Sequence, residues 1–205
     1  MGRYLGTLQL YAYLFGTSGT IAQGGGTITV DQQSLMGSAI NEAERFIDDY
    51  TRRNFAGTAG SVYYNRFTQQ SQMAGQAFYL DQDLHTLTGV VNGDTTTIPV
   101  GSVWTEPRNA GPPYRMLRLK SQYSWVWNTD SDMIVSGTWG FGTVAPAAIV
   151  SATEQLAAYY YRLKDVGPGD ISGFSEGGEV TYPKGVPDTV KFLLSPYRSR
   201  TGGRI

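Results

Sequence analysis

The sequence predicts an α+β fold, in which a small helical bundle is interrupted by a large inserted antiparallel β domain, either a barrel or a sandwich. Apolar residues recur at helical spacing over residues 32–53 and again over residues 146–165. Between these helices, residues 59–139 contain short aromatic and β-branched segments separated by turn residues. Neither flanking helix can bury its apolar face alone, so the two are expected to pack together.

The first long helix is predicted over residues 32–53, with Asp31 placed to cap the free N–H groups at its start. Its apolar face consists of Leu35, Ala39, Ala43, Phe46 or Ile47, and Tyr50. The charged residues of the segment fall largely elsewhere, which is the pattern of a helix with one side buried.

The second long helix opens at Pro146, whose missing N–H costs nothing at the first helical position. Its apolar stripe consists of Ile149, Ala152 or Thr153, Leu156, Tyr159 or Tyr160, and Leu163. Two shorter helices are predicted over residues 4–15 and 187–195, the latter stopped by Pro196.

The inserted segments include QAFYLD, HTLTGVV, SWVWN and DMIVSGTW, each of which is typical of a short strand. Asn92-Gly93 indicates a hairpin, because both residues tolerate positive φ. Trp125 and Trp127 alternate, which predicts that they share one side of a strand.

Four parts of the chain follow from this pattern. They are an N-terminal short helix and linker (1–30), a helical core (31–58 plus 140–198), the inserted β domain (59–139) and a mobile basic tail (199–205). The glycine-rich stretch 167–186 is expected to be a loop within the helical core.

Composition excludes several classes of function. Charged residues make up 16% of the chain, against roughly 25% in average globular proteins. Such a surface favours burial against neighbouring subunits. Cysteine is absent, which excludes disulfides and Cys-based metal sites. No apolar run approaches the ~20 residues that span a bilayer, and the N-terminus fits a signal peptide poorly, so we expect synthesis and assembly in a cytoplasm without membrane contact.

Two short motifs match catalytic or cofactor patterns without the required context. Gly173–Gly177 matches G-x-S-x-G, but no buried strand precedes Ser175, and His85, the single histidine, lies upstream. Gly140–Ala145 matches G-x-G-x-x-A, but no second βαβ unit follows it. The sequence therefore predicts no enzyme and no cofactor.

No metal site is predicted, and the acidic pairs of the insertion are expected to be solvated turn residues, whereas glycan binding remains an alternative. His85 has no second histidine or cysteine to join it, but Asp81 with Asp83, and Asp130 with Asp132, would share a face if extended. Such pairs suit Ca²⁺ or Mg²⁺, or the acid and base of a glycosidase. Most of the aromatic residues of the insertion are expected in its core, yet a carbohydrate-binding or hydrolytic β module lined by Trp104, Trp125 or Trp127 stays open.

In order and spacing, several segments resemble the head-to-tail connector (adaptor, or head completion) proteins of tailed bacteriophages. The segments are Ala43–Phe55, Gly137–Gly142, Val144–Arg162 and Val186–Arg198. The first ends in a Tyr-x-Arg-x-Phe-like sequence, and the last resembles the closing helix and basic tail of that family. The similarity covers most of residues 31–55 and 137–200.

The resemblance implies a virion neck protein that forms a homo-oligomeric ring of about a dozen copies under the portal. It implies contacts with the portal, with a downstream connector or tail-terminator protein, and non-specifically with packaged DNA. Portal docking would use Tyr197, Arg198, Arg200 and Arg204. A loop facing the channel or the next ring would present Ser172, Phe174, Glu176 and Glu179. Another neck or tail-terminator protein is the remaining alternative.

Overall fold

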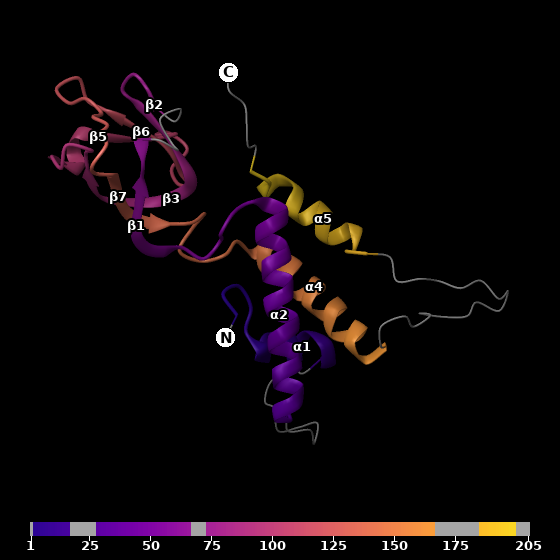
Figure 1. Ribbon diagram of the computed structural model, residues 1–205. Helices are drawn as coiled ribbons and strands as arrows, with labels where there is room; N and C mark the ends of the chain where they lie inside the picture. Colours follow the sequence, from indigo (N-terminus) through magenta and orange to yellow (C-terminus); the bar gives the residue numbers. More distant parts are fainter. Residues whose placement is uncertain (1, 17–27, 67–72, 167–184, 200–205) are drawn as a thin grey trace. The chain divides into compact units, whose positions relative to one another are not determined.

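The computed structural model describes residues 2–16, 28–66, 73–166 and 185–199. The described chain forms two compact units (Figure 1). The helical unit comprises the described residues up to Arg52 and those from Pro146 onward, and the β unit comprises Arg53–Ala145.

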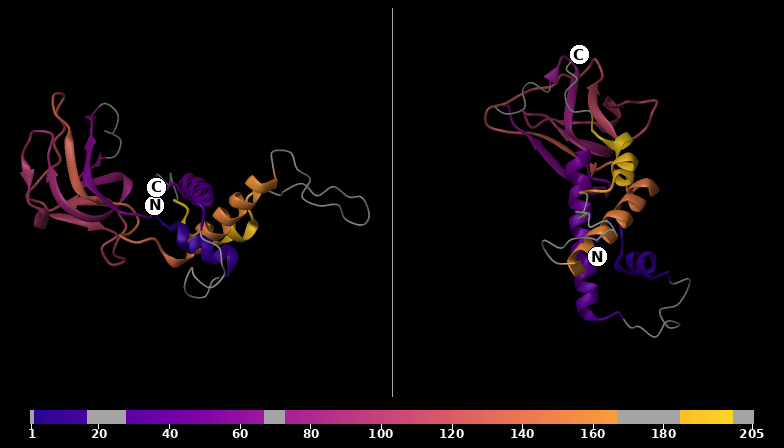
Figure 2. Two further views of the ribbon diagram at one scale, coloured as in Figure 1. Left: turned by 90° about the horizontal axis from the view of Figure 1, so that it is seen from below. Right: turned by 90° about the vertical axis from the view of Figure 1, so that its right-hand side faces the viewer.

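The helical unit contains α1 (Thr7–Phe15), α2 (Val30–Thr51), α4 (Ala147–Val166) and α5 (Asp188–Leu194), followed by the short 3₁₀ turn η3 (Ser195–Tyr197). The long helices α2 and α4 pack against each other, as expected for the two helices that flank the insertion (Figure 2). The shorter α1 contacts both of them, and α5 packs mainly on α4.

The start of α2 differs from the sequence prediction. Thr29 rather than Asp31 is the N-cap: its hydroxyl accepts a hydrogen bond from the Gln32 N–H at 3.2 Å, and the Gln32 side chain accepts from the Thr29 N–H at 3.1 Å. This reciprocal pair is a capping box, and it satisfies two donors that a helix start leaves free. Asp31 lies in the first turn, where a negative charge still favours the helix dipole.

The buried face of α2 is also rotated from the predicted one. Leu35 is exposed and Phe46 and Tyr50 are only half-buried, so these three lie at the border of the stripe. The buried residues of α2 are Met36, Ala39, Ile40, Ala43, Glu44, Ile47 and Thr51. In α4 the predicted stripe is confirmed around Ile149 and Leu156, although Pro146 precedes the helix rather than opening it.

The β unit is one open antiparallel sheet of seven strands in its described residues. The main order is β1 (Thr58–Tyr64), β7 (Met133–Trp139), β3 (Ala77–Val91), β6 (Tyr114–Leu119), β5 (Val103–Glu106). The short β2 (Met73–Ala74) and β4 (Thr97–Ile98) also pair with β3. The predicted α+β class is confirmed, and the sheet is open rather than closed into a barrel.

The close approach of β7 to β3 requires glycine at one position. Gly137 on β7 faces β3, and a Cβ there would lie 2.1 Å from the Thr86 carbonyl oxygen. The long β3 bends where its pairing register shifts, between Tyr79 and Leu84 and again beyond Leu84. Such irregularities strengthen twist and bend a strand, which lets one sheet fold over its own core. That core contains Tyr64, Phe78, Leu84, Val90, Ile98, Val103, Leu117, Leu119, Trp125, Met133, Val135 and Trp139.

One strand prediction was wrong, and two segments predicted as separate strands are continuous. QAFYLD and HTLTGVV form the single strand β3, and SWVWN is not a strand at all. The backbone of SWVWN bonds instead to a turn: Asn92 accepts from the Val126 N–H at 2.9 Å, and the Gly93 N–H donates to the Val126 carbonyl at 3.0 Å. Its two tryptophans nevertheless both pack on Phe78.

The hairpin predicted at Asn92-Gly93 does join β3 to β4. Its positive φ, however, is at Thr95 (67°). Gly93 is needed instead because the turn lies close to the backbone of residue 126: a Cβ on Gly93 would be 2.5 Å from the Val126 carbonyl oxygen.

Candidate assembly surfaces

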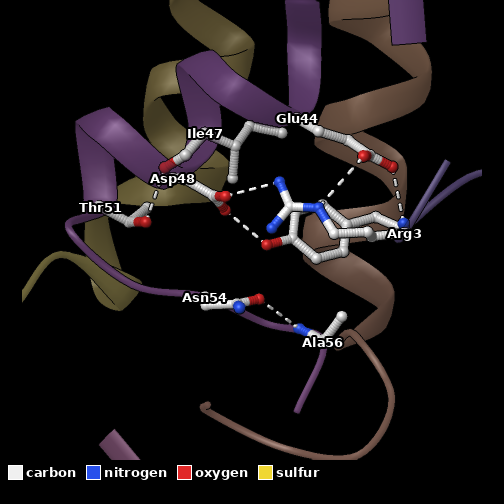
Figure 3. A network of polar contacts seen from close by, with 8 residues as sticks. Arg3, Glu44, Ile47, Asp48, Thr51, Asn54 and Ala56 are labelled. Atoms are coloured by element: carbon white, nitrogen blue, oxygen red, sulfur yellow. Dashed lines mark hydrogen bonds and ion pairs between the residues drawn. The ribbon is translucent and has the colours of Figure 1, made fainter. Parts of the chain in front are cut away.

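The N-terminal segment is fixed on α2 by a polar network (Figure 3). Glu44, almost fully buried, accepts a hydrogen bond from the Tyr4 backbone N–H at 2.7 Å. Asp48 accepts from the Tyr4 hydroxyl at 2.5 Å and from Arg3 Nη2 at 2.6 Å. Arg3 also lies 3.6 Å from Glu44, so one arginine bridges two carboxylates one turn apart on the helix. The network orders the chain that leads into α1.

The negative charges of this network stabilise the charged form of Arg3. Partial burial alone would lower the pKa of Arg3, but its hydrogen bond to Asp48 and the surrounding negative charges raise it instead. The network therefore favours the charged form of Arg3. Sequence patterns did not single out this network, although Glu44 gave a signal: it lies four residues after Ile40 and three before Ile47, on the buried face of α2.

The helix α1 has no charged residue, and most of its side chains are apolar or aromatic. Leu10 is fully buried, whereas Leu8, Tyr13 and Phe15 are 58%, 49% and 52% exposed. A helix of such low polarity ordinarily has more than one face covered by other elements. Phe192 on α5 adds a further side chain that is 79% exposed. The packing of the helical unit therefore leaves several large apolar side chains exposed.

The beginning of the predicted basic tail lies at the C-terminal end of α2. The Ser199 N–H donates to the Thr51 carbonyl oxygen at 2.7 Å, which satisfies one of the acceptors that a helix end leaves free. The Arg198 guanidinium lies 5.0 Å from the centre of the Tyr50 ring, and Tyr50 stacks on Phe46 at 5.8 Å. Arg198, predicted as a portal-docking residue, is therefore held within its own chain.

The other predicted site residues fall mostly outside the described chain. Tyr197 is half-buried in η3, next to Arg198. Arg200 and Arg204 of the predicted tail lie outside the described residues. The same holds for the predicted loop residues Ser172, Phe174, Glu176 and Glu179, and for the G-x-S-x-G match around Ser175.

The two chain segments that enter and leave the β unit are tied together at its base. The Phe141 N–H donates to the Asn54 carbonyl at 2.7 Å, and the Gly57 N–H donates to the Gly142 carbonyl at 2.7 Å. The Arg53 guanidinium lies 5.3 Å from the centre of the Phe141 ring. Hydrogen bonds therefore hold the entry and exit segments of the β unit next to each other, as an inserted domain requires.

Asp83 forms ion pairs with two arginines in this part of the β unit. It is buried, and its two carboxylate oxygens meet Arg53 Nη1 at 3.1 Å and Arg115 Nε at 2.8 Å. Its carbonyl accepts from the Gly140 N–H at 2.7 Å. Burial lowers the pKa of Arg53, against the opposing effect of Asp83. One acidic side chain on β3 thus pairs with arginines of the entry segment and of β6, and no periodic pattern in the sequence predicts this contact.

This arrangement changes the interpretation of the carboxylate pairs. Asp81 and Asp83 do not share a face, because β3 is irregular there: Asp83 is buried and Asp81 is exposed. Asp130 and Asp132 lie outside any strand, and Asp132 accepts from Asn65 at 3.2 Å. In the described residues, no group of three or more His, Asp or Glu side chains is placed to hold a metal ion.

The dinucleotide-like motif has a structural role. Gly140 follows β7, which is antiparallel to both of its neighbours, so the parallel βαβ unit of such sites is not formed there. Gly140 has a φ of 137°, and a Cβ would lie 2.9 Å from Gly57 Cα. His85 lies half-buried on β3.

The three tryptophans of the glycan alternative do not form a common exposed surface. Trp125 is buried and donates to the Gln76 carbonyl at 2.9 Å, and Trp127 packs on Phe78. Trp104 is partly exposed, with the Arg108 guanidinium 3.8 Å from its ring centre.

Among the described helices, none is long and apolar enough to cross a membrane.

Comparison with known proteins identifies the fold. No protein-family model matches the chain, and no curated protein sequence matches it. Among solved structures, the chain is similar to one in the neck of an empty gene transfer agent (GTA) particle computed with C6 symmetry. The TM-score is 0.62 at 19% identity, and the match covers 99% of this chain and 94% of that one.

Two further structures agree. A chain in the virion of a native GTA particle gives a TM-score of 0.60 at 18% identity, with 97% of this chain and 92% of that one covered. A chain in the neck of a native GTA particle computed with C12 symmetry gives 0.55 at 18% identity, with 83% and 85% covered. The chain therefore has the fold of a phage-like virion neck component. The connector resemblance seen in the sequence is confirmed at the level of the fold.

Proposed function

We propose that this protein is a structural subunit of a virion neck, forming an oligomeric ring between the portal and the tail components. The observation that carries the proposal is the fold match to a neck chain over almost the whole length of both proteins. A match of both units together, rather than of one common module, supports a shared role and not only a shared architecture. The particle would be assembled in the host cytoplasm.

Ring assembly gives a reason for the exposed apolar side chains. Two of the similar structures were computed with C6 and C12 symmetry, and a ring of more than two subunits needs two different complementary surfaces on every subunit. The uncharged α1, with Leu8 and Phe15 exposed, is our candidate for one of these surfaces, covered by a second copy of the chain. The low charged fraction of 16% fits a surface that is largely buried in an assembly.

The subunit surface on α1 can be tested by substitution. Leu8→Glu with Phe15→Glu places two charges on this face while leaving the buried Leu10 in place. We expect loss of the oligomer, measured by light scattering after size-exclusion chromatography, with the helical signal at 222 nm retained. Gln9→Glu is the matched control, because it adds a charge to an exposed polar position of the same helix. An oligomer that survives the double substitution would remove α1 from the interface.

The remaining parts of the proposal concern the partners. Arg200 and Arg204 of the basic tail would dock on the portal, with Tyr197 and Arg198 fixing where the tail leaves the helical unit. The loop 167–186 would face the channel or the next ring, and the ring would form part of the DNA exit channel. No enzymatic step belongs to this role.

A particle-level experiment tests the proposed function. Particles produced without this chain should contain closed heads and separate tails, and supplying the chain should join them. Electron microscopy of purified particles counts joined and separate parts directly. Normally joined particles in the absence of the chain would contradict a neck role, whereas absence of heads altogether would point to a role in head formation.

A further inference from the structure

One face of the β unit concentrates positive charge. In the β5–β6 pair, Val103 lies opposite Leu119, and both side chains belong to the core. Side chains alternate along a strand, so Trp104 and Arg118, which lie opposite each other, point to the other face of the sheet. Lys120 follows Arg118 by two positions and lies just beyond the end of β6.

An aromatic ring lies beside two of the cations on this face. The Trp104 ring has the Arg108 guanidinium at 3.8 Å and the Lys120 ammonium at 5.9 Å from its centre. On the other side of β6, Tyr79 of β3 lies opposite Met116, diagonal to Arg118, and is half exposed. We name Trp104, Arg108, Arg118 and Lys120 the β5–β6 basic face.

Few carboxylates neutralise this face. Over residues 103–120 the chain has four cationic residues and one carboxylate, and they are Arg108, Arg115, Arg118, Lys120 and Glu106. Glu106 pairs with Arg108 at 3.2 Å, and Arg115 is engaged by the buried Asp83. Neither Arg118 nor Lys120 forms a salt bridge with a carboxylate of the described residues.

The geometry of the face fits a repeating anion. Alternate residues of a strand lie about 6.8 Å apart, so Arg118 and Lys120 can each meet a different anionic group. Stacking on Trp104 and pairing with Glu106 hold the Arg108 guanidinium in place, so two cations are left for phosphate oxygens. Glu106 lies on the same face, but it is paired with Arg108. Arg118 and Lys120 therefore remain as the cations that can bind a polyanion.

We propose that the β5–β6 basic face binds the phosphodiester backbone of duplex DNA without sequence preference. The inference rests on the proposed neck position, where the packaged duplex passes through the ring. It extends that function by assigning the DNA contact to named residues of the β unit. Repetition around a ring would make the summed contact strong even where one copy binds weakly.

The test measures binding of the full chain to a fluorescein-labelled DNA duplex by anisotropy over a range of NaCl concentrations. Each phosphate contact adds about 0.9 to the slope of log affinity against log salt, so Arg118→Gln with Lys120→Gln should lower the slope by about 1.8. We expect the affinity in 50 mM salt to fall by at least about tenfold. Arg45→Gln with Arg162→Gln is the matched control, since both arginines are exposed on the helical unit.

Tryptophan fluorescence and native mass are measured on the same samples, so that folding and assembly are known. Reduced slope and affinity in the β5–β6 variant alone, with fold and oligomer unchanged, support the inference. Equal losses in both variants, or no DNA binding by the unaltered chain, overturn it. Loss of the oligomer with unchanged DNA binding also overturns it and assigns the face to a protein contact. DNA binding through this face by a chain that never forms a ring would contradict the proposed function and leave the inference standing.

Discussion

Asp83 gives the sharpest stability prediction, because one buried carboxylate meets two arginines that come from different segments of the β unit. Its side chain is 3% exposed, that of Arg53 is 14% exposed and that of Arg115 is 37% exposed. Asp83→Asn removes the negative charge with almost no change of volume. It removes the carboxylate charge that pairs with both the Arg53 and the Arg115 guanidinium groups.

Removing one partner of a buried ion pair costs about 3–5 kcal/mol, and the partial exposure of Arg115 places this case near the lower end, at about 3 kcal/mol. In a domain of this size that loss lowers the midpoint of thermal unfolding by about 12 °C or more. The four tryptophans of the chain all lie in the β unit, at positions 104, 125, 127 and 139. Tryptophan fluorescence therefore follows the β unit, while circular dichroism at 222 nm mainly follows the helices.

We expect Asp83→Asn to shift the fluorescence transition far more than the helical one. Arg115→Met, which removes the more exposed partner, is the control and should cost less than the aspartate substitution. A fluorescence midpoint within 2–3 °C of the unaltered protein, equivalent to well under 1 kcal/mol, would refute the reasoning that this ion pair holds the base of the β unit.

Two further predictions concern packing. Glu44→Ala leaves the buried Tyr4 N–H without its acceptor, and we expect a loss of about 1–3 kcal/mol together with faster hydrogen exchange of the N-terminal segment, seen by mass spectrometry. Unchanged exchange at Tyr4 would show that the network does not hold that segment. Gly137→Ala places a Cβ 2.1 Å from the Thr86 carbonyl and should destabilise the β unit by about 3 kcal/mol in urea unfolding followed by tryptophan fluorescence. Gly60→Ala, with open space around its Cβ, should stay within about 0.5 kcal/mol, and equal effects of the two would contradict the close approach of β7 to β3.

Helical periodicity was the most informative part of the sequence. It predicted both long helices to within a few residues, because the apolar spacing of α2 and α4 follows from their packing on each other. The buried face of α2 was predicted with a small rotational error. Leu35 and Met36 are adjacent, and only tertiary contacts decide which of the two is buried. The cap was misassigned because Thr29 and Asp31 are both good capping residues, and the Gln32 partner decides in favour of Thr29.

The strands were less predictable, because tertiary contacts override local pattern. The segment around Trp125 alternates like a strand, yet the Asn92 side chain takes the backbone groups that a neighbouring strand would have bonded. The carboxylate at Asp83 looked like half of an exposed pair, and its burial depends on Arg53 and Arg115, which are distant in sequence. Long-range ion pairs of this kind leave no periodic trace in a single sequence.

The central claim, a ring-forming neck subunit, is tested most directly by the native mass of the purified full-length chain, alone and mixed with the portal of the same particle. We predict a single closed assembly, on its own or only on the portal, whose mass corresponds to about a dozen copies of this chain. A chain that stays monomeric at every concentration and leaves the mass of the portal unchanged would contradict the claim.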